Sequence, residues 1–310
     1  MNHRFQSLIR LLVTAGLLVA LTHYFAIDWQ ATFLHIGRIQ PFWLTGALVA
    51  VVLMHGIAVV TVKKLLEMKG YSIPFRRLLQ NHLRGLLVAQ FAPSALLGDV
   101  IRIHDLQNSN PPNGSSQTAN HHPHPHSWKT VTWAFTLQRV VNLCIALTIL
   151  TATSILIVSH QQQSIAFLGL MVAISLLFFL GLLALVRKCR PQLWQKLSQW
   201  IPTIRELRVC TFFGLLQNMT LLLAVTMVSQ GMEMNVPFHY LIAAVEASLM
   251  VVVLPISLNG LGVRESVYVA YLTPQFATIE QSVALSLTMY SISLLISTCG
   301  IVAWAKKHSR

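Results

Sequence analysis

Long apolar runs alternate with short polar connections along most of this chain. Six runs are long enough to cross a bilayer as helices: residues 8–25, 42–62, 128–158, 165–186, 209–228 and 283–305. A span needs about 20 apolar residues, and the run at 128–158 is longer than the ~30 Å of hydrocarbon requires. The pattern predicts an all-α, polytopic membrane protein with about six full spans.

Four segments between these runs have other patterns. Residues 28–40 read as a polar connection, and residues 187–208 combine basic residues with apolar residues at helical spacing, as in a helix that lies in the interface. Residues 72–91 form an amphipathic helix, for which Ser72 can serve as the cap and Pro74 suits the first turn. Residues 107–127, rich in Asn, Pro, Ser and His, lack apolar periodicity and predict a disordered loop.

Two short polar motifs interrupt the apolar pattern. The first, FAPSALLGDVIRIHD, covers residues 91–105, and the second, PISLNGLGVRES, covers residues 255–266. Pro93, Gly98 and Arg102 have the same relative spacing as Pro255, Gly260 and Arg264, and Ser94 and Ser257 closely follow each Pro. Together with Gly262, these Pro and Gly residues are expected to break helices and reverse the chain. The two motifs therefore predict two re-entrant or broken helical hairpins that arose by internal duplication.

The distribution of Lys and Arg predicts the topology. If the six runs cross fully and both motif segments enter and leave on one side, nearly all loop Lys and Arg residues fall on the cytoplasmic side, and only Arg38 falls outside. Both termini are then cytoplasmic, and the two hairpins enter from opposite faces as an inverted repeat. We expect one integral membrane domain over residues 1–310, with a first half at 1–106, the flexible loop at 107–127 and a second half at 128–310.

Charged residues within the motifs and spans are the candidate binding groups. Ionisable groups inside a membrane usually face a cavity, and guanidinium groups suit a phosphate. We expect Arg102, Arg139 and Arg264 to line a shared cavity, with Asp99 and Glu265 as counter-ions. The remaining candidates for contact with a lipid head group are Asn259, Ser94 and Ser257. The alternative is that the Asp99–Arg102 and Arg264–Glu265 pairs only pin the hairpins.

Two residues leave their role open. Arg139 has no acidic neighbour in its own helix, so its partner is Asp99, Glu246 or a lipid phosphate. Glu246 lies between alanines in an apolar helix, where it serves either helix packing or a substrate or proton role.

Composition excludes several classes of function. Hydrophobic residues make up 55% of the chain and charged residues only 10%, which excludes a soluble enzyme. The net charge of +13 follows from basic cytoplasmic loops and does not indicate nucleic-acid binding. No catalytic motif, cofactor motif or metal-ligand spacing is present, and the four cysteines lie far apart. The loop histidines at 121, 122, 124 and 126 lack a fixed geometry, so we expect no enzyme activity, no cofactor and no metal.

PSALLGDVIR, the LQR of the long span and PISLNGLGVRES resemble the lysylphosphatidylglycerol synthase transmembrane-domain family, also called flippase-like, in order and spacing. The similarity covers residues 9–306. It departs at Leu97 and Gln138, where the family usually has a Gly and an acidic residue. The resemblance implies movement of lipids or lipid-linked groups between leaflets, by a stand-alone member without the soluble synthase domain.

We therefore expect a flippase-like protein of the bacterial inner membrane that handles an anionic phospholipid or lipid-linked head group. Its partners would be membrane lipids, through a phospholipid or polyprenyl phosphate, and not nucleic acid. One alternative is a non-catalytic accessory subunit that scaffolds a lipid- or glycan-modifying enzyme. Another is an intramembrane transferase that uses Asp99 or Glu265 as a base.

Overall fold

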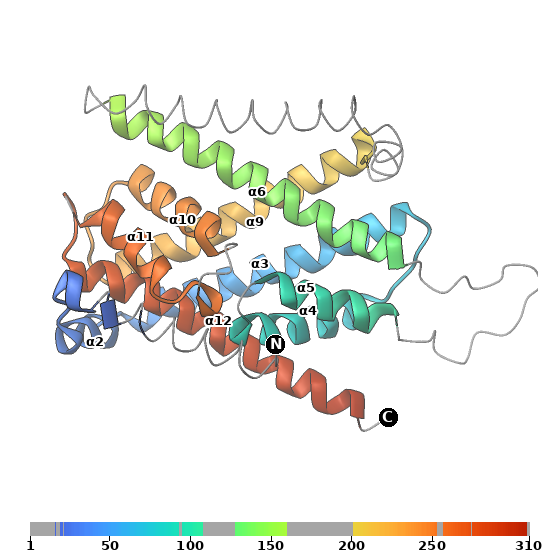
Figure 1. The fold of residues 1–310 in the computed structure, drawn as a ribbon, viewed down its shortest axis with the longest axis horizontal. Coiled ribbons are helices and arrows are strands. Elements are labelled where there is room, and N and C mark those ends of the chain that lie inside the picture. Colours follow the sequence, from blue (N-terminus) through green and yellow to red (C-terminus); the bar gives the residue numbers. More distant parts are fainter. Residues whose placement is uncertain are drawn as a thin grey trace, which may run out of the picture.

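The chain forms a bundle of long helices in a computed structural model, which describes residues 16, 19–20, 22–92, 95–107, 128–159, 201–252, 257–273 and 275–308. Regular secondary structure in these residues is entirely helical. Four helices are long and apolar enough to cross a membrane: α3 (Pro41–Met68), α6 (Trp128–Ser159), α9 (Ile204–Gly231) and α12 (Ile279–His308). They run lengthwise through the molecule in Figure 1, as in a multi-pass membrane protein.

Several observed helices extend beyond the predicted spans. Helix α3 continues to Met68 instead of ending at residue 62, because Lys63 and Lys64 pair with Glu67 at 3.6 and 3.7 Å in the final turns. Helix α9 begins at Ile204, five residues before the predicted span, where Thr203 and Glu206 form a reciprocal capping box. Residues 204–208 therefore belong to this span and not to the predicted interfacial helix.

Several predicted segments lie outside the described residues. These are most of the first span at 8–25, the span at 165–186, the interfacial helix up to residue 200, the loop at 108–127, and Pro93, Ser94 and Pro255.

The predicted polar connection at 28–40 is wrong, because it contains helix α2 (Trp29–Gly37). Asp28 caps this helix: its Oδ1 accepts the backbone N–H groups of Gln30 and Ala31 at 2.8 and 3.1 Å. An Asp before a run of helix-compatible residues is a standard start signal. The prediction of Ser72 as a cap is also wrong, because the next helix begins after Pro74 and no side chain caps it.

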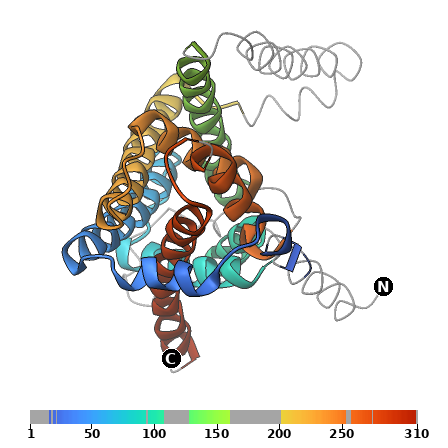
Figure 2. The ribbon, with the colours of Figure 1, turned by 90° about the vertical axis from the view of Figure 1, so that its left-hand side faces the viewer.

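Two antiparallel helix pairs pack among the long helices. The first hairpin consists of α4 (Phe75–Phe91) and α5 (Ala95–Gln107), and the second of α10 (Phe238–Val252), the 3₁₀ turn η1 (Leu258–Gly260) and α11 (Val263–Leu272). At 1.5 Å per residue these helices are roughly 15–26 Å long, shorter than the hydrocarbon layer. The two hairpins occupy opposite halves of the long axis in Figure 1, and Figure 2 shows the bundle end-on.

Helix α12 fixes the relative direction of the two hairpins. Leu83 and Leu87 of α4 lie beside Gly300, whereas Gln90 bonds to Ser293, so α4 and α12 are antiparallel. Arg264 and Thr273 of α11 bond to Ser286 and Ser282 respectively, so α11 is also antiparallel to α12. Helices α4 and α11 thus run in one direction. Since α4 ends at its hairpin tip and α11 begins at its tip, the hairpins approach each other from opposite ends of the bundle.

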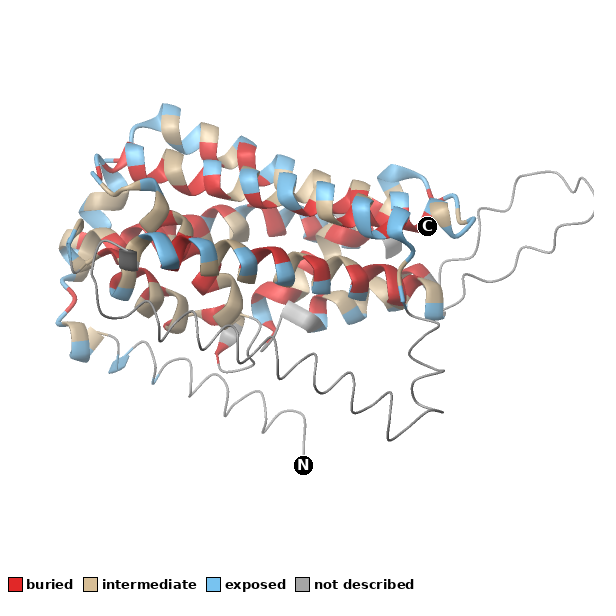
Figure 3. Cartoon of the chain, turned by 90° about the horizontal axis from the view of Figure 1, so that it is seen from above, coloured by how far each residue is buried: buried red, intermediate tan, exposed pale blue. Residues whose placement is uncertain are grey.

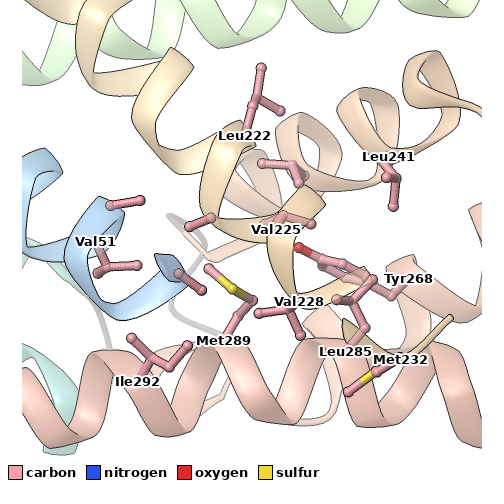
Figure 4. Packing of buried hydrophobic residues seen from close by; sticks show 14 of the residues in the cluster. Val51, Leu222, Val225, Val228, Met232, Leu241, Tyr268, Leu285, Met289 and Ile292 are labelled. Carbon is pink, nitrogen blue, oxygen red and sulfur yellow. The ribbon is translucent and has the colours of Figure 1, made fainter. Parts of the chain in front are cut away.

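A core of small and branched side chains holds α3, α9, α12 and the second hairpin together. Ala47, Ala224, Ala244 and Ala284 are fully or almost fully buried there, which allows close helix approach. Figure 4 shows Met289 of α12 pointing toward residues of α3 and α9 in this core. Buried and exposed residues alternate along the helices in Figure 3. The exposed residues include large apolar ones such as Phe42, as expected for lipid contact.

Candidate functional site

Asp99 joins two arginines from different helices into the first arginine cluster, defined as Asp99, Arg102 and Arg139. Arg102 Nη1 donates to Asp99 Oδ1 at 2.7 Å, and Arg139 Nη2 lies 3.4 Å from Asp99 Oδ2. Asp99 and Arg102 come from α5 and Arg139 from α6. Of the three partners predicted for Arg139, Asp99 is therefore the one that the structure supplies.

The first arginine cluster has one positive charge in excess. Among the described residues, no second carboxylate pairs with either arginine. The Nε groups of Arg102 and Arg139 are both buried and have no hydrogen-bond partner in the part of the chain that the structure describes. The side chains are accessible to different degrees, with exposed fractions of 13% for Arg102 and 32% for Arg139. Two buried N–H donors and a net positive charge favour an anionic ligand.

Close contact between α4 and α5 positions Arg102. A Cβ at Gly85 would collide with the Arg102 side chain, and a Cβ at Gly98 would lie 2.5 Å from the Gly85 carbonyl oxygen. Asn81 Nδ2 donates to the Arg102 carbonyl oxygen at 2.9 Å, and Arg102 Nη2 donates to the His82 carbonyl oxygen at 3.4 Å. Gly98 therefore serves close helix packing inside α5, and the prediction that it breaks a helix is wrong.

Arg84 lies on the same hairpin but forms a separate ion pair. Its Nη1 is 3.1 Å from Asp105 Oδ2, and both side chains are largely buried. This pair is balanced in charge, unlike the neighbouring first arginine cluster.

The second arginine cluster consists of Arg264, Glu265 and Ser286. Glu265 Oε2 accepts the Gly262 N–H at 2.6 Å, and its Oε1 accepts from Ser286 Oγ at 2.9 Å and from Arg264 Nη2 at 3.4 Å. Arg264 Nε also donates to Ser286 Oγ at 3.1 Å, and the guanidinium lies over the Tyr290 ring. The cluster is neutral, and both oxygens of the fully buried Glu265 are satisfied. Because Glu265 also caps the start of α11, this cluster fixes the second hairpin.

The tip of the second hairpin turns through left-handed backbone. Asn259, Gly260 and Gly262 have φ angles of 45°, 78° and 86°. A Cβ at Gly260 would also lie 2.6 Å from the Val252 side chain, so only glycine fits this position. Gly260 and Gly262, which were predicted to reverse the chain, both lie in this turn.

The two hairpin tips meet at a polar junction. The Asn259 N–H donates to the Ala92 carbonyl oxygen at 3.4 Å, and Asn259 Nδ2 donates to Gln90 Oε1. Gln90 Nε2 in turn donates to Ser293 Oγ at 2.8 Å. Ser257 precedes Asn259 by two residues and is buried. Its hydroxyl has no hydrogen-bond partner among the described residues.

The structure does not bring all predicted arginines into one cavity. Gly85, beside Arg102, packs at the level of Gly300 on α12, whereas Arg264 bonds to Ser286, fourteen residues earlier. At 1.5 Å per residue, the two clusters are about 20 Å apart along α12. In each hairpin the arginine lies in the helix that follows the tip. Because the two hairpins point toward each other, Arg102 and Arg264 lie on opposite sides of the junction between the tips. Arg102 and Arg139 meet; Arg264 does not join them.

Sequence reasoning missed several polar residues that complete these sites. Asn81, Gln90 and Ser286 bond directly to motif residues, although none lies inside a motif. Gln90 is the clearest of the three signals, because it is a polar residue in the apolar run from Leu86 to Ala92.

A model of the protein family described as the lysylphosphatidylglycerol synthase TM region matches residues 7–300 of this chain. The match includes both hairpins, all of α3, α6 and α9, and α12 up to residue 300. A comparison with curated proteins gave no match.

Proposed function

Because this chain belongs to the lysylphosphatidylglycerol synthase TM-region family, we propose that it is a lipid translocase that binds an anionic head group at the first arginine cluster. The ligand class is a phosphate-bearing lipid, either a phospholipid or a lipid-linked head group.

The charge excess of the first arginine cluster is the observation that carries this proposal. Asp99 neutralises one of the two guanidinium groups, and the buried Nε groups of both arginines lack acceptors. A phosphate accepts several charge-assisted hydrogen bonds and matches the planar donor set of arginine. An unpaired guanidinium at membrane depth is costly, so a bound anion would stabilise the site. The role of these residues is binding and not chemistry.

The opposed hairpins offer a route across the bilayer. Their tips meet at the junction of Gln90 and Asn259, and each hairpin is shorter than the hydrocarbon layer. We infer that the hairpins form an inverted repeat among six full spans, and that a head group passes beside their tips. Irregular backbone at membrane depth is tolerated where it lines such a cavity.

The orientation that we propose places both termini in the cytoplasm of a bacterial cell, with the protein in its inner membrane. Basic residues gather at one end of the bundle, where Lys69 pairs with Glu206 at 2.7 Å and stacks over Trp133. Those contacts join the end of α3 to the starts of α6 and α9. Lys63, Lys64, Arg76, Arg77 and Lys129 are close to the same helix ends in sequence, as the positive-inside tendency requires.

Reconstitution in liposomes tests this function. Vesicles of phosphatidylcholine with a trace of fluorescent phosphatidylglycerol report the movement of an anionic lipid between leaflets through quenching from outside. We expect Arg102→Gln and Arg139→Gln each to slow protein-dependent movement about tenfold or more, since a hydrogen bond to a charged group contributes roughly 1.5–3 kcal/mol.

The matched control is the double variant Arg84→Gln/Asp105→Asn, which removes a buried ion pair from the same hairpin without changing its net charge. It should retain most of the wild-type rate. Equal rates for wild type and empty vesicles would exclude translocation of this lipid. Unchanged rates in both single variants would exclude the first arginine cluster as the binding site.

A further inference from the structure

Glu246 is a buried carboxylate without a hydrogen bond. It lies in the middle of α10, its exposed fraction is 0%, and neither Oε1 nor Oε2 has a hydrogen-bond partner among the described residues. The other two fully or nearly fully buried glutamates of the described residues differ from it: Glu206 pairs with Lys69, and Glu265 accepts three hydrogen bonds.

An ionised carboxylate in this setting would be very unfavourable. Burial of an unpaired ion costs several kcal/mol even after relaxation, and a buried acceptor without a donor adds to that cost. A metal cation would require several further oxygen ligands, and the described residues contain no group of three or more potential metal ligands. A proton requires only one carboxylate oxygen.

The titratable groups on the helices packed against α10 form no ion pair with Glu246. Helix α11 contributes Arg264, Glu265, Tyr268 and Tyr271, of which Tyr268 lies within electrostatic range of Glu246. The titratable residues of the other helices packed against α10 are Lys129, Arg139 and Cys144 on α6, and Arg205, Glu206, Arg208 and Cys210 on α9. None of these has an ion pair with Glu246. Glu246 therefore has no charged partner among the described residues of these helices.

We propose that Glu246 is a proton-binding site that couples lipid movement to proton movement. In the described conformation the carboxyl group is neutral. When the second hairpin moves and opens α10 to water, the carboxyl O–H bond breaks, the proton passes to water, and water stabilises the carboxylate that remains. The bound proton offsets the charge of an anionic head group, so the two would cross in the same direction. This coupling rests on the proposed function; proton binding itself does not.

Infrared spectroscopy of the purified full-length protein tests proton binding without any transport assay. The wild type should show the carbonyl stretch of an un-ionised carboxylic acid at neutral pH, and Glu246→Gln should remove it. Glu206→Gln is the matched control, because it replaces an equally buried but paired carboxylate and should leave that band intact. If Glu246→Gln removes only ionised carboxylate absorbance, Glu246 is charged and the proposal is overturned.

Folding gives a second readout. Glutamine reproduces the shape and neutrality of a protonated glutamate, so Glu246→Gln should keep the wild-type unfolding temperature in detergent. A clear loss of stability in this variant would show that the ionised form is the one that the fold requires, which would also overturn proton binding.

Liposomes with an imposed pH difference test the coupling. With one proton carried per lipid, one pH unit across the membrane should accumulate labelled phosphatidylglycerol about tenfold in the leaflet that faces the more alkaline side. Glu246→Gln should still equilibrate the lipid but lose this asymmetry. If the wild type moves the labelled lipid but its distribution does not depend on the pH difference, coupling is overturned and the proposed function is left intact. If lipid moves no faster with the protein than in empty vesicles, both the proposed function and the coupling are overturned. The infrared result would still decide whether Glu246 binds a proton.

Discussion

The two hairpins carry matching motifs but use their charges differently. In the first hairpin, Asp99 forms ion pairs with both Arg102 and Arg139. One positive charge and the two buried Nε–H donors of these arginines remain unmatched. In the second hairpin, Glu265 forms an ion pair with Arg264 alone. Its carboxylate also accepts hydrogen bonds from the Gly262 N–H and the Ser286 hydroxyl. We call the first cluster open, because one charge and two donors are unmatched within it, and the second closed, because its charges and hydrogen bonds are satisfied internally.

This difference shows that a repeated motif need not repeat a function. The second cluster stabilises a turn that contains left-handed residues, and its carboxylate acts as a helix cap. The first hairpin needs no such cap, because contact between Gly85 and Gly98 holds its two helices together. The carboxylate of Asp99 therefore pairs with Arg139 of α6 instead of capping a helix.

The largest effect is expected from breaking the closed cluster. Glu265→Ala leaves Arg264 buried without its counter-ion and the Gly262 N–H without an acceptor. Loss of one partner from a buried ion pair typically costs about 3 kcal/mol or more. We expect the free energy of unfolding to fall by that amount in an unfolding titration of the detergent-solubilised protein.

Glu67→Ala is the control for this change. Glu67 also pairs with basic residues, Lys63 and Lys64, but its side chain is 37% exposed. Exposed pairs contribute about 0–1 kcal/mol, so its unfolding curve should barely shift. Equal destabilisation by both substitutions would contradict the distinction between a structural cluster and a surface pair.

Sequence patterns alone predicted the helical class, the long helix α6 and the turn at Gly260 and Gly262. These follow from apolar run length and from the backbone freedom of glycine, which are local properties. The shared partner of Arg139 was predicted among three candidates, because a membrane arginine without an acidic neighbour needs one from elsewhere. The glutamine at position 138, where the family usually has an acid, is consistent with the charge excess now observed around Asp99.

The role of Gly98 and the separation of the two arginine clusters depend on tertiary packing, so the sequence alone could not predict them. Gly98 resembled a helix breaker, yet only the approach of Gly85 on another helix reveals why a side chain is excluded there. The separation of Arg264 from Arg102 depends on how both hairpins pack along α12, which spacing within a motif cannot encode. Helix α2 was missed for a different reason: it is short, and its start signal is the single residue Asp28.

A smaller effect should follow from opening the first hairpin. Gly98→Ala places a Cβ 2.5 Å from the Gly85 carbonyl oxygen and 2.9 Å from the Ala89 Cβ, so the two helices must separate. Overpacking of this kind costs about 1–3 kcal/mol and would shift Asp99 relative to Arg139. We expect lower stability in the same titration together with slower movement of phosphatidylglycerol. Gly56→Ala, a helix position with nothing within 4 Å, should change neither; if it matched Gly98→Ala, close packing would not be the cause.

The smallest effect concerns the junction that joins the open and the closed hairpin. Gln90 and Asn259 bond across the two tips, so Gln90→Ala, Asn259→Gly and their combination form a double-mutant cycle. Glycine is the appropriate replacement at 259 because it tolerates the φ of 45° there. Hydrogen bonds between membrane helices average about 0.6 kcal/mol in such cycles, and we expect a coupling of that size. The exposed bond from Tyr240 to Gln275 provides a control cycle with a coupling near zero. A coupling near zero for both pairs would mean that the tips only touch, and a head group bound in the first hairpin would then have no energetic link to the second through this bond.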